Sequence, residues 1–228
     1  LAFWVSQQID VSLNHPDKKI KTNADEIVAL MTPIIKSFFT DIGMEITNDA
    51  IQVFGGYGYT KDQGIEQLFR DNRITPIYEG TNSVQAIDLV YRKILNNKIF
   101  EKYIAQLSNE VKDFSKDNKL SLFADKFFKY LELLNNFTLW LGEKNKSSKD
   151  DVSAACNDYL KVLGYIALAH SWLKILKVSH SKLKENKTFY EDKINTAKYY
   201  FDKILPRVQS HYLSAITGSD TMMKSNFN

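Results

Sequence analysis

The sequence is poor in the residues that build disulfides and metal centres: it has one cysteine, Cys156, and four histidines. A single thiol forms no internal disulfide and excludes a metal cluster made of several cysteines. The histidines are His15, His170, His180 and His211, and no spacing between them is typical of metal ligands. We therefore expect no metal site, and a reducing, cytoplasmic location.

Glycine and proline are also scarce, with 9 and 4 residues in a chain of 228, and no long segment alternates apolar and polar residues. Few turn-forming residues and no period of two predict helices rather than strands. The most apolar stretch, 165–169, is far too short to cross a bilayer, so we expect no membrane span. Because the residues after Leu1 already have the pattern of a helix interior, we expect the chain to begin within the fold.

Neither sign of charge is in excess: 30 basic and 27 acidic side chains give a formal net charge of +3. The basic residues are mostly scattered lysines without an arginine cluster, so the sequence lacks the basic patch by which proteins bind nucleic acid. What the chain has instead is 44% apolar residues, enough to bury a substantial hydrophobic core.

The first part of the chain has the periodicity of amphipathic helices, with apolar residues every three or four positions. Pro33 predicts a kink or a late start of the second helix, and Gly43 is a candidate interruption of it. Thr81 or Asn82 can cap the last helix of this part. The predicted helices cover 1–13, 24–54, 64–73 and the residues that follow 81 or 82.

The second part of the chain is predicted to hold three or four long helices, at 99–116, 120–140, 151–183 and 189–205. The polar segment 142–150 is expected to be a loop with Asp151 as the N-cap of the following helix, and Pro206 to end or kink the fourth helix. Short links between antiparallel helices predict a bundle. The fold class is therefore all-α, with a helical bundle domain at 1–97, incomplete at its N-terminus, and a second, bundle-like helical domain at 98–228.

Glu79 is the strongest candidate for a catalytic residue. It lies between Tyr78 and Gly80 in a loop that opens into a helix, and a carboxylate in an apolar pocket there is suited to act as a general base. Gly80 has no side chain, so a substrate can approach the backbone closely. Taken alone, the more common interpretation is a solvated glutamate at a helix start.

The run from Gln52 to Tyr59 (QVFGGYGY) is the candidate cofactor site. Adjacent glycines at a helix end permit left-handed backbone angles, and their amides can hold an anionic diphosphate. Gln52 supplies a donor and an acceptor for a ribose hydroxyl or a carbonyl. No strand precedes the run, so it is not the dinucleotide-binding G-x-G-x-x-G motif, and in isolation it is most often only a helix C-cap.

Three blocks in this order and spacing resemble the C-terminal helical domain of the acyl-CoA dehydrogenases: 52–59, 69–71 (FRD) and 77–82 (IYEGTN). The segment after residue 99 resembles the extra helical tail of one bacterial subgroup of that family, on residues 159–173 and 196–206. Together the two resemblances span nearly the whole chain.

The resemblance implies FAD-dependent α,β-dehydrogenation of an acyl-CoA thioester. Glu79 matches the catalytic base, which removes the α-proton while the β-hydride passes to FAD, giving a 2-enoyl-CoA. Tyr78 and Gly80 match positions that line the thioester, and Thr81 matches a flavin-contacting position at the helix start.

The resemblance also implies assembly and partners. Gln52, Gly55 and Gly56 match a segment that contacts the ADP part of FAD bound mainly by a neighbouring subunit, so a homo-oligomer with a shared flavin site is expected. An electron-transfer flavoprotein is the expected electron acceptor.

The chain departs from the family in two respects. At Ser83 the subgroup often has glycine and other members have glutamine. The N-terminal helical domain, the middle β-domain and an earlier arginine-bearing helix of the family cannot be located, so we expect the chain alone to be an inactive C-terminal portion of a dehydrogenase. The alternatives are a non-catalytic helical remnant or oligomerisation module, and an unrelated helical bundle.

Overall fold

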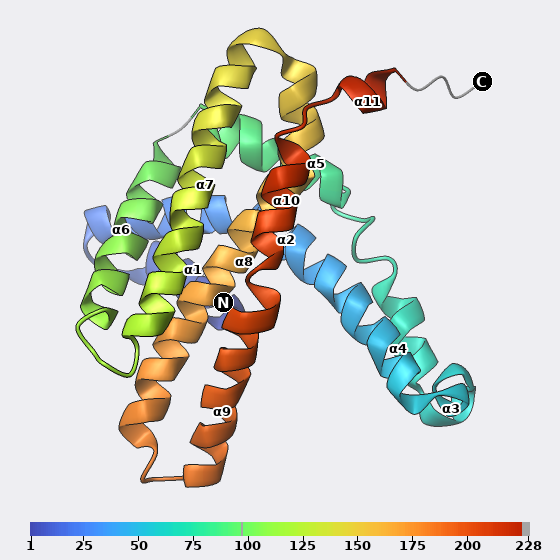
Figure 1. Ribbon diagram of the computed structural model, residues 1–228, viewed down its shortest axis with the longest axis vertical. Helices are drawn as coiled ribbons and strands as arrows, with labels where there is room; N and C mark the ends of the chain where they lie inside the picture. Colours follow the sequence, from blue (N-terminus) through green and yellow to red (C-terminus); the bar gives the residue numbers. More distant parts are fainter. Residues whose placement is uncertain (97, 225–228) are drawn as a thin grey trace.

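The computed structural model describes residues 1–96 and 98–224, and within them every regular element is helical (Figure 1). The prediction of an all-α fold is thereby confirmed. The elements of the first part are α1 (Ala2–Asn14), α2 (Lys18–Phe54), α3 (Gly56–Tyr59), the 3-10 turn η1 (Lys61–Gln63), α4 (Ile65–Asn72), α5 (Asn82–Asp88) and the π-helical turn η2 (Leu89–Ile94). The second part consists of α6 (Ile99–Phe114), α7 (Ser121–Ser147), α8 (Lys149–Lys182), α9 (Lys187–Tyr199), the π-helical turn η3 (Tyr200–Ile204), α10 (Arg207–Ala215) and α11 (Asp220–Met223).

Helix α2 is continuous from Lys18 to Phe54, so the predicted late start at Pro33 and the interruption at Gly43 are wrong. The helix begins earlier because the Asp17 carboxylate caps it, accepting from the amides of Lys19 (2.7 Å) and Ile20 (3.1 Å). Gly43 serves close packing instead: a Cβ there would lie 3.0 Å from the side-chain nitrogen of Asn72 on α4.

The two halves of α2 have different surroundings (Figure 1). The first half contributes buried residues from Ala24 to Phe38 to the core. The second half carries α3 and α4 away from the body of the molecule, and we call residues 43–73 the arm. By length and composition α2 is apolar enough to cross a membrane, but the buried residues of its first half are part of the hydrophobic core.

Helix α8 is the centre of the second part and is buried over most of its length. It contacts α2, α5 and η2 from the first part, and α6, α7, α9 and α10 from the second. Buried residues from Val5 to Ala215 form one continuous hydrophobic core. The predicted domain boundary falls at residue 97, outside the described residues, and the division into two domains stays a prediction.

The predicted loop at 142–150 is wrong, because α7 continues to Ser147 and α8 begins at Lys149. Residues 142–147 form the last turns of α7, and Lys149 and Asp150 the first turn of α8, so only Ser148 separates the two helices. Asp151 is not the N-cap of α8 either. Ser148 is the cap, and its hydroxyl accepts from the amide of Asp151 at 3.2 Å.

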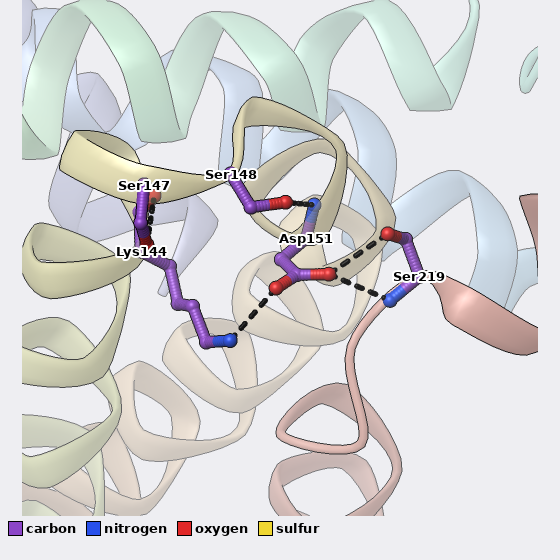
Figure 2. A network of polar contacts seen from close by, with 5 residues as sticks. All are labelled: Lys144, Ser147, Ser148, Asp151 and Ser219. Carbon is purple, nitrogen blue, oxygen red and sulfur yellow. Dashed lines mark hydrogen bonds and ion pairs between the residues drawn. The ribbon is translucent and has the colours of Figure 1, made fainter.

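Figure 2 shows what Asp151 does instead: its carboxylate joins three elements of the second part. It accepts from Lys144 Nζ on α7 (2.8 Å) and from both the amide (2.9 Å) and the hydroxyl (2.8 Å) of Ser219, which precedes α11. These partners, Lys144 first, hold the pKa of Asp151 well below its usual range. The network therefore fastens the segment after α10 to the junction of α7 and α8.

Pro206 ends the fourth predicted helix as expected, but the chain remains helical on both sides of it. The turn η3 precedes Pro206 and α10 follows. The hydroxyl of Tyr200 in η3 donates to the carbonyl of Tyr165 at 2.7 Å, which fixes this segment against α8.

Candidate functional site

The connection between α4 and α5 carries Glu79, and hydrogen bonds between its own backbone groups stabilise it. The amide of Tyr78 donates to the carbonyl of Ile74 (3.1 Å), and that of Asn82 donates to the carbonyl of Pro76 (3.2 Å). Thr81 is the N-cap of α5, accepting from the amide of Val84 at 3.4 Å, so the prediction of a cap at Thr81 or Asn82 is confirmed. We call residues 78–81 the base loop.

Glu79 has a backbone φ of +55°, the one positive φ among the non-glycine residues that the structure describes. This left-handed conformation is uncommon for residues with a side chain and costs on the order of 1–3 kcal/mol where other contacts enforce it. Gly80 follows with φ +83°, a conformation that glycine adopts readily. Consecutive positive φ values turn the chain sharply at the candidate base.

Two side chains hold the carbonyl groups of this pair. Gln85 Nε2 on α5 donates to the carbonyl of Glu79 at 2.9 Å. Lys36 Nζ on α2 donates to the carbonyl of Gly80 at 2.6 Å and to Asn82 Oδ1 at 2.9 Å. The base loop is thereby tied to a helix that lies more than forty residues earlier in the sequence.

A groove of about 490 Å³ runs between α1 and α2 to the base loop. Its lining residues are Ala2, Val5, Ser6, Ile9, Val28, Thr32, Ile35, Lys36, Glu79 and Gln85. The walls from α1 and α2 are mainly aliphatic, while Glu79, Lys36 and Gln85 make one end polar. Such a groove fits a molecule with an apolar portion and one polar group next to Glu79.

The structure places the predicted site residues in two groups. Tyr78, Glu79, Gly80 and Thr81 share the base loop and are all exposed. Gln52 lies near the end of α2, 16 residues beyond Lys36, which is about 24 Å along the helix at about 1.5 Å per residue. Within one chain, the base loop and the glycine turn therefore belong to different surfaces.

The glycine turn after Gln52 is open at the surface. Gly55 has φ +60°, and its amide donates to the carbonyl of Gln52 at 3.2 Å. A Cβ built on Gly55 or Gly56 would meet no atom within 4 Å, so a ligand has free access to this backbone. Gly58 is different: a Cβ there would lie 2.7 Å from the carbonyl of Ile51, so this glycine allows close packing of α3 on α2.

Sequence reasoning missed Lys36, Gln85 and the apolar wall formed by α1. Lys36 is one of many lysines, and nothing local relates it to a loop 44 residues later. Gln85, by contrast, has a local signal, because it lies on the first turns of the helix that the base loop opens.

Among the described residues, the remaining cysteine and the buried histidine have structural surroundings. Burial raises the pKa of Cys156 to about 12, and its thiol donates to the carbonyl of Val152, so this cysteine is packed and unreactive. His170 is buried beside Glu110. No three His, Cys, Asp or Glu side chains in the described part of the chain are grouped so that they would hold a metal ion.

Two family models match this chain in succession. Residues 18–95 match the model described as "Acyl-CoA dehydrogenase, C-terminal domain". Residues 107–226 match the one described as "Acetyl-CoA dehydrogenase C-terminal like". The two matched segments contain the groove wall on α2 together with the base loop, and the helical tail, respectively.

Curated relatives match over part of their length. A butyryl-CoA dehydrogenase of Syntrophomonas wolfei is 27% identical over 210 residues, covering 87% of this chain and 34% of the relative. A 3-methylmercaptopropionyl-CoA dehydrogenase of Ruegeria pomeroyi is 36% identical over 83 residues, or 36% of this chain and 14% of the relative. The chain thus spans about a third or less of the length of these proteins.

Solved structures show the same fold. Caenorhabditis elegans ACDH-11 in complex with C11-CoA superposes with a TM-score of 0.70 at 18% identity, over 98% of this chain and 37% of the other. An acyl-CoA dehydrogenase complexed with FAD from Bacillus anthracis gives a TM-score of 0.66 at 15% identity, over 91% and 36%. The helical arrangement of both parts of the chain therefore occurs in these larger proteins.

Proposed function

This chain belongs to the acyl-CoA dehydrogenase family and represents its C-terminal helical region, and from this we propose that it carries the catalytic base of a flavin-dependent dehydrogenase. Glu79 would remove the α-proton of an acyl-CoA thioester, with loss of the β-hydride giving the 2-enoyl-CoA. The observation that carries the proposal is the position of Glu79, held at φ +55° at the polar end of an aliphatic groove.

The chemistry explains why such a setting is needed. A proton α to a thioester is only weakly acidic, so its base must be close, oriented and little solvated during transfer. The aliphatic walls of the groove would seat part of the acyl chain and exclude water. Tyr78 and Gly80 would flank the thioester, with Gly80 contributing its backbone rather than a side chain.

We propose FAD as the cofactor, which when bound supplies the hydride acceptor for the β-carbon. Thr81, at the N-terminus of α5, would contact flavin bound next to Glu79. Gln52 lies near the end of α2 and Gly55 and Gly56 directly follow it, on a different surface from the base loop. Their open backbone suits the ADP part of FAD held mainly by a neighbouring subunit, which makes a homo-oligomer part of the proposal. An electron-transfer flavoprotein is the proposed electron acceptor.

The test is the variant Glu79→Gln in flavin-loaded protein that includes this chain. We expect it to retain flavin but to lose, by at least about a hundredfold, the bleaching of flavin absorbance on addition of an acyl-CoA, because the amide cannot accept the α-proton. Glu132→Gln, an exposed carboxylate on α7, is the matched control and should bleach normally. Unchanged bleaching in Glu79→Gln, or loss of its flavin, would show that Glu79 is not the base.

A second candidate is a non-catalytic helical module whose role is assembly. The observation in its favour is the exposed apolar surface of the arm, which includes Ile46, Val53, Phe54, Tyr57, Tyr59 and Leu68. Flavin-loaded wild-type protein that self-associates but shows no bleaching with acyl-CoA thioesters of varied chain length would favour this candidate over the first.

A further inference from the structure

The base loop keeps a conformation that its own residues do not favour. Glu79 is left-handed although it has a side chain, and the carbonyls of Glu79 and Gly80 are each held by one side chain from a helix. Gln85 is close to the base loop in sequence, because it lies on α5, the helix that directly follows the loop. Lys36 belongs to α2, so its bond to Gly80 connects the loop to a rigid element outside it.

The ammonium group of Lys36 is oriented by a second set of contacts. The side-chain nitrogen of Asn82 donates to three acceptors on α2: Asp41 Oδ1 (2.6 Å), Thr40 Oγ1 (3.0 Å) and the Ser37 carbonyl (3.2 Å). These bonds orient the amide so that its oxygen, Oδ1, faces Lys36 and accepts from it. Helix α2 therefore supplies both the lysine and the groups that direct its acceptor. This arrangement spans 46 residues of sequence and leaves Lys36 little freedom.

Lys36 lines the same groove as Glu79, yet its ammonium group donates to the Gly80 carbonyl and to Asn82 Oδ1 rather than to the Glu79 carboxylate. A hydrogen bond from an ammonium to a carbonyl is charge-assisted and roughly twice as strong as one between neutral groups. The bond from Lys36 to the Gly80 carbonyl is thus well suited to hold the strained base loop, while the Glu79 carboxylate remains available to a substrate.

We propose that Lys36 is a positioning residue that fixes the Gly80–Thr81 peptide, next to Glu79, and thereby aims the carboxylate of Glu79 along the groove. The functional consequence rests on the proposed function: Lys36 should raise the rate of proton abstraction with little effect on thioester binding. The structural consequence, an ordered base loop, does not depend on that function.

The experiment compares three variants. Lys36→Met keeps the aliphatic stem but removes the donor, and Lys36→Arg keeps a charged donor. Lys21→Met is the matched control, because Lys21 also lies on α2 and donates from Nζ to a backbone carbonyl, that of Leu13, away from the loop. In each protein, hydrogen–deuterium exchange of peptides covering 76–84 is compared with that of peptides from α8.

Lys36→Met should speed exchange in 76–84 by on the order of tenfold without changing exchange in α8, since only a local contact is removed. In flavin-loaded protein it should slow thioester-dependent bleaching by on the order of a hundredfold at unchanged thioester affinity, as expected for a displaced catalytic group. Lys36→Arg should restore much of both properties, and Lys21→Met should resemble wild type in both.

Two results would overturn the proposal. Unchanged exchange in 76–84 in Lys36→Met would show that the loop is ordered without the lysine. Weaker thioester binding at an unchanged bleaching rate of the bound form would make Lys36 a substrate contact rather than a positioning residue. If wild-type protein bleaches with no thioester, the proposed function fails, and the exchange comparison alone decides whether Lys36 orders the loop.

Discussion

His170 is a buried imidazole on α8 that is joined to Glu110 on α6 at 3.0 Å. Because a carboxylate only accepts, the imidazole donates from Nε2. Glu110 also accepts from Gln106 (3.0 Å) and pairs with Lys174 (2.8 Å). Burial lowers the pKa of His170 below its ordinary 6.5, while the hydrogen bonds from His170 and Lys174 hold the pKa of Glu110 far below its usual range.

These shifts predict a loss of stability in acid. With its lowered pKa, the folded His170 binds a proton less readily than it does in the unfolded chain, so stability is complete above about pH 6.5 and falls as the pH decreases through that value. Glu110 acts in the same direction at lower pH, since its folded pKa is depressed. Thermal midpoints measured between pH 7.5 and 5 should decline less steeply in His170→Gln, whose amide can still donate to Glu110.

The control for this prediction is His180→Gln. Burial also lowers the pKa of His180, but this side chain is less buried, so its substitution should leave most of the decline in place. An identical pH dependence in His170→Gln and wild type would show that other groups determine the acid sensitivity.

At the scale of elements, the contact between α2 and α8 depends on one glycine. A Cβ on Gly164 of α8 would lie 2.7 Å from the ring of Phe38 on α2, and this ring also packs edge-on against Tyr165 with centroids 4.9 Å apart. The two helices come from the two segments that the family models match separately, so Gly164 lets the tail pack directly on the first part of the chain.

Gly164→Ala should therefore destabilise the protein by about 1–3 kcal/mol, the usual cost of an extra methyl group in a tightly packed core. Gly142→Ala is the matched control on α7, where an added Cβ meets no atom within 4 Å. There the higher helix propensity of alanine should stabilise by about 0.5–1 kcal/mol. Urea unfolding followed by circular dichroism measures both; equal effects of the two substitutions would contradict this account of Gly164.

At the scale of the whole molecule, the arm projects from the body (Figure 1), and several of its large apolar side chains are exposed. Tyr57, Tyr59 and Val53 are each more than two-thirds exposed, whereas the first half of α2 is part of the core. Exposed apolar clusters of this kind mark interaction surfaces. The proposed sharing of the flavin site would place a second copy of the chain there.

Val53→Glu tests this use of the arm. Val53 is 84% exposed, so the substitution should leave the helical circular dichroism spectrum unchanged but shift sedimentation from an associated species toward the monomer, because the charge opposes burial in an interface. Leu139→Glu is the control, a 68% exposed position on α7. If both variants sediment like wild type, or if the wild type is already monomeric, the arm is not the contact between copies.

Local features made much of this molecule predictable. The periodicity of apolar residues located most helices, and the threonine after Gly80 identified the start of α5. Predictions failed where polarity or a special residue was interpreted without its surroundings. The polar segment 142–150 is not a loop, because α7 ends at Ser147 and α8 begins at Lys149, and Pro33 and Gly43 both lie within a continuous helix. At Pro33, which is buried, tertiary packing outweighs local propensity.

The helical class, the family resemblance and the candidate base can all be predicted from the sequence, since periodicity, turn residues and motifs are properties of neighbouring positions. Three features emerge from the folded chain: α1 and α2 form a groove that ends at Glu79, Lys36 holds the base loop, and the glycine turn lies on a separate surface. These arrangements depend on contacts between residues far apart in the chain, and such contacts leave no periodic or local signal in the sequence.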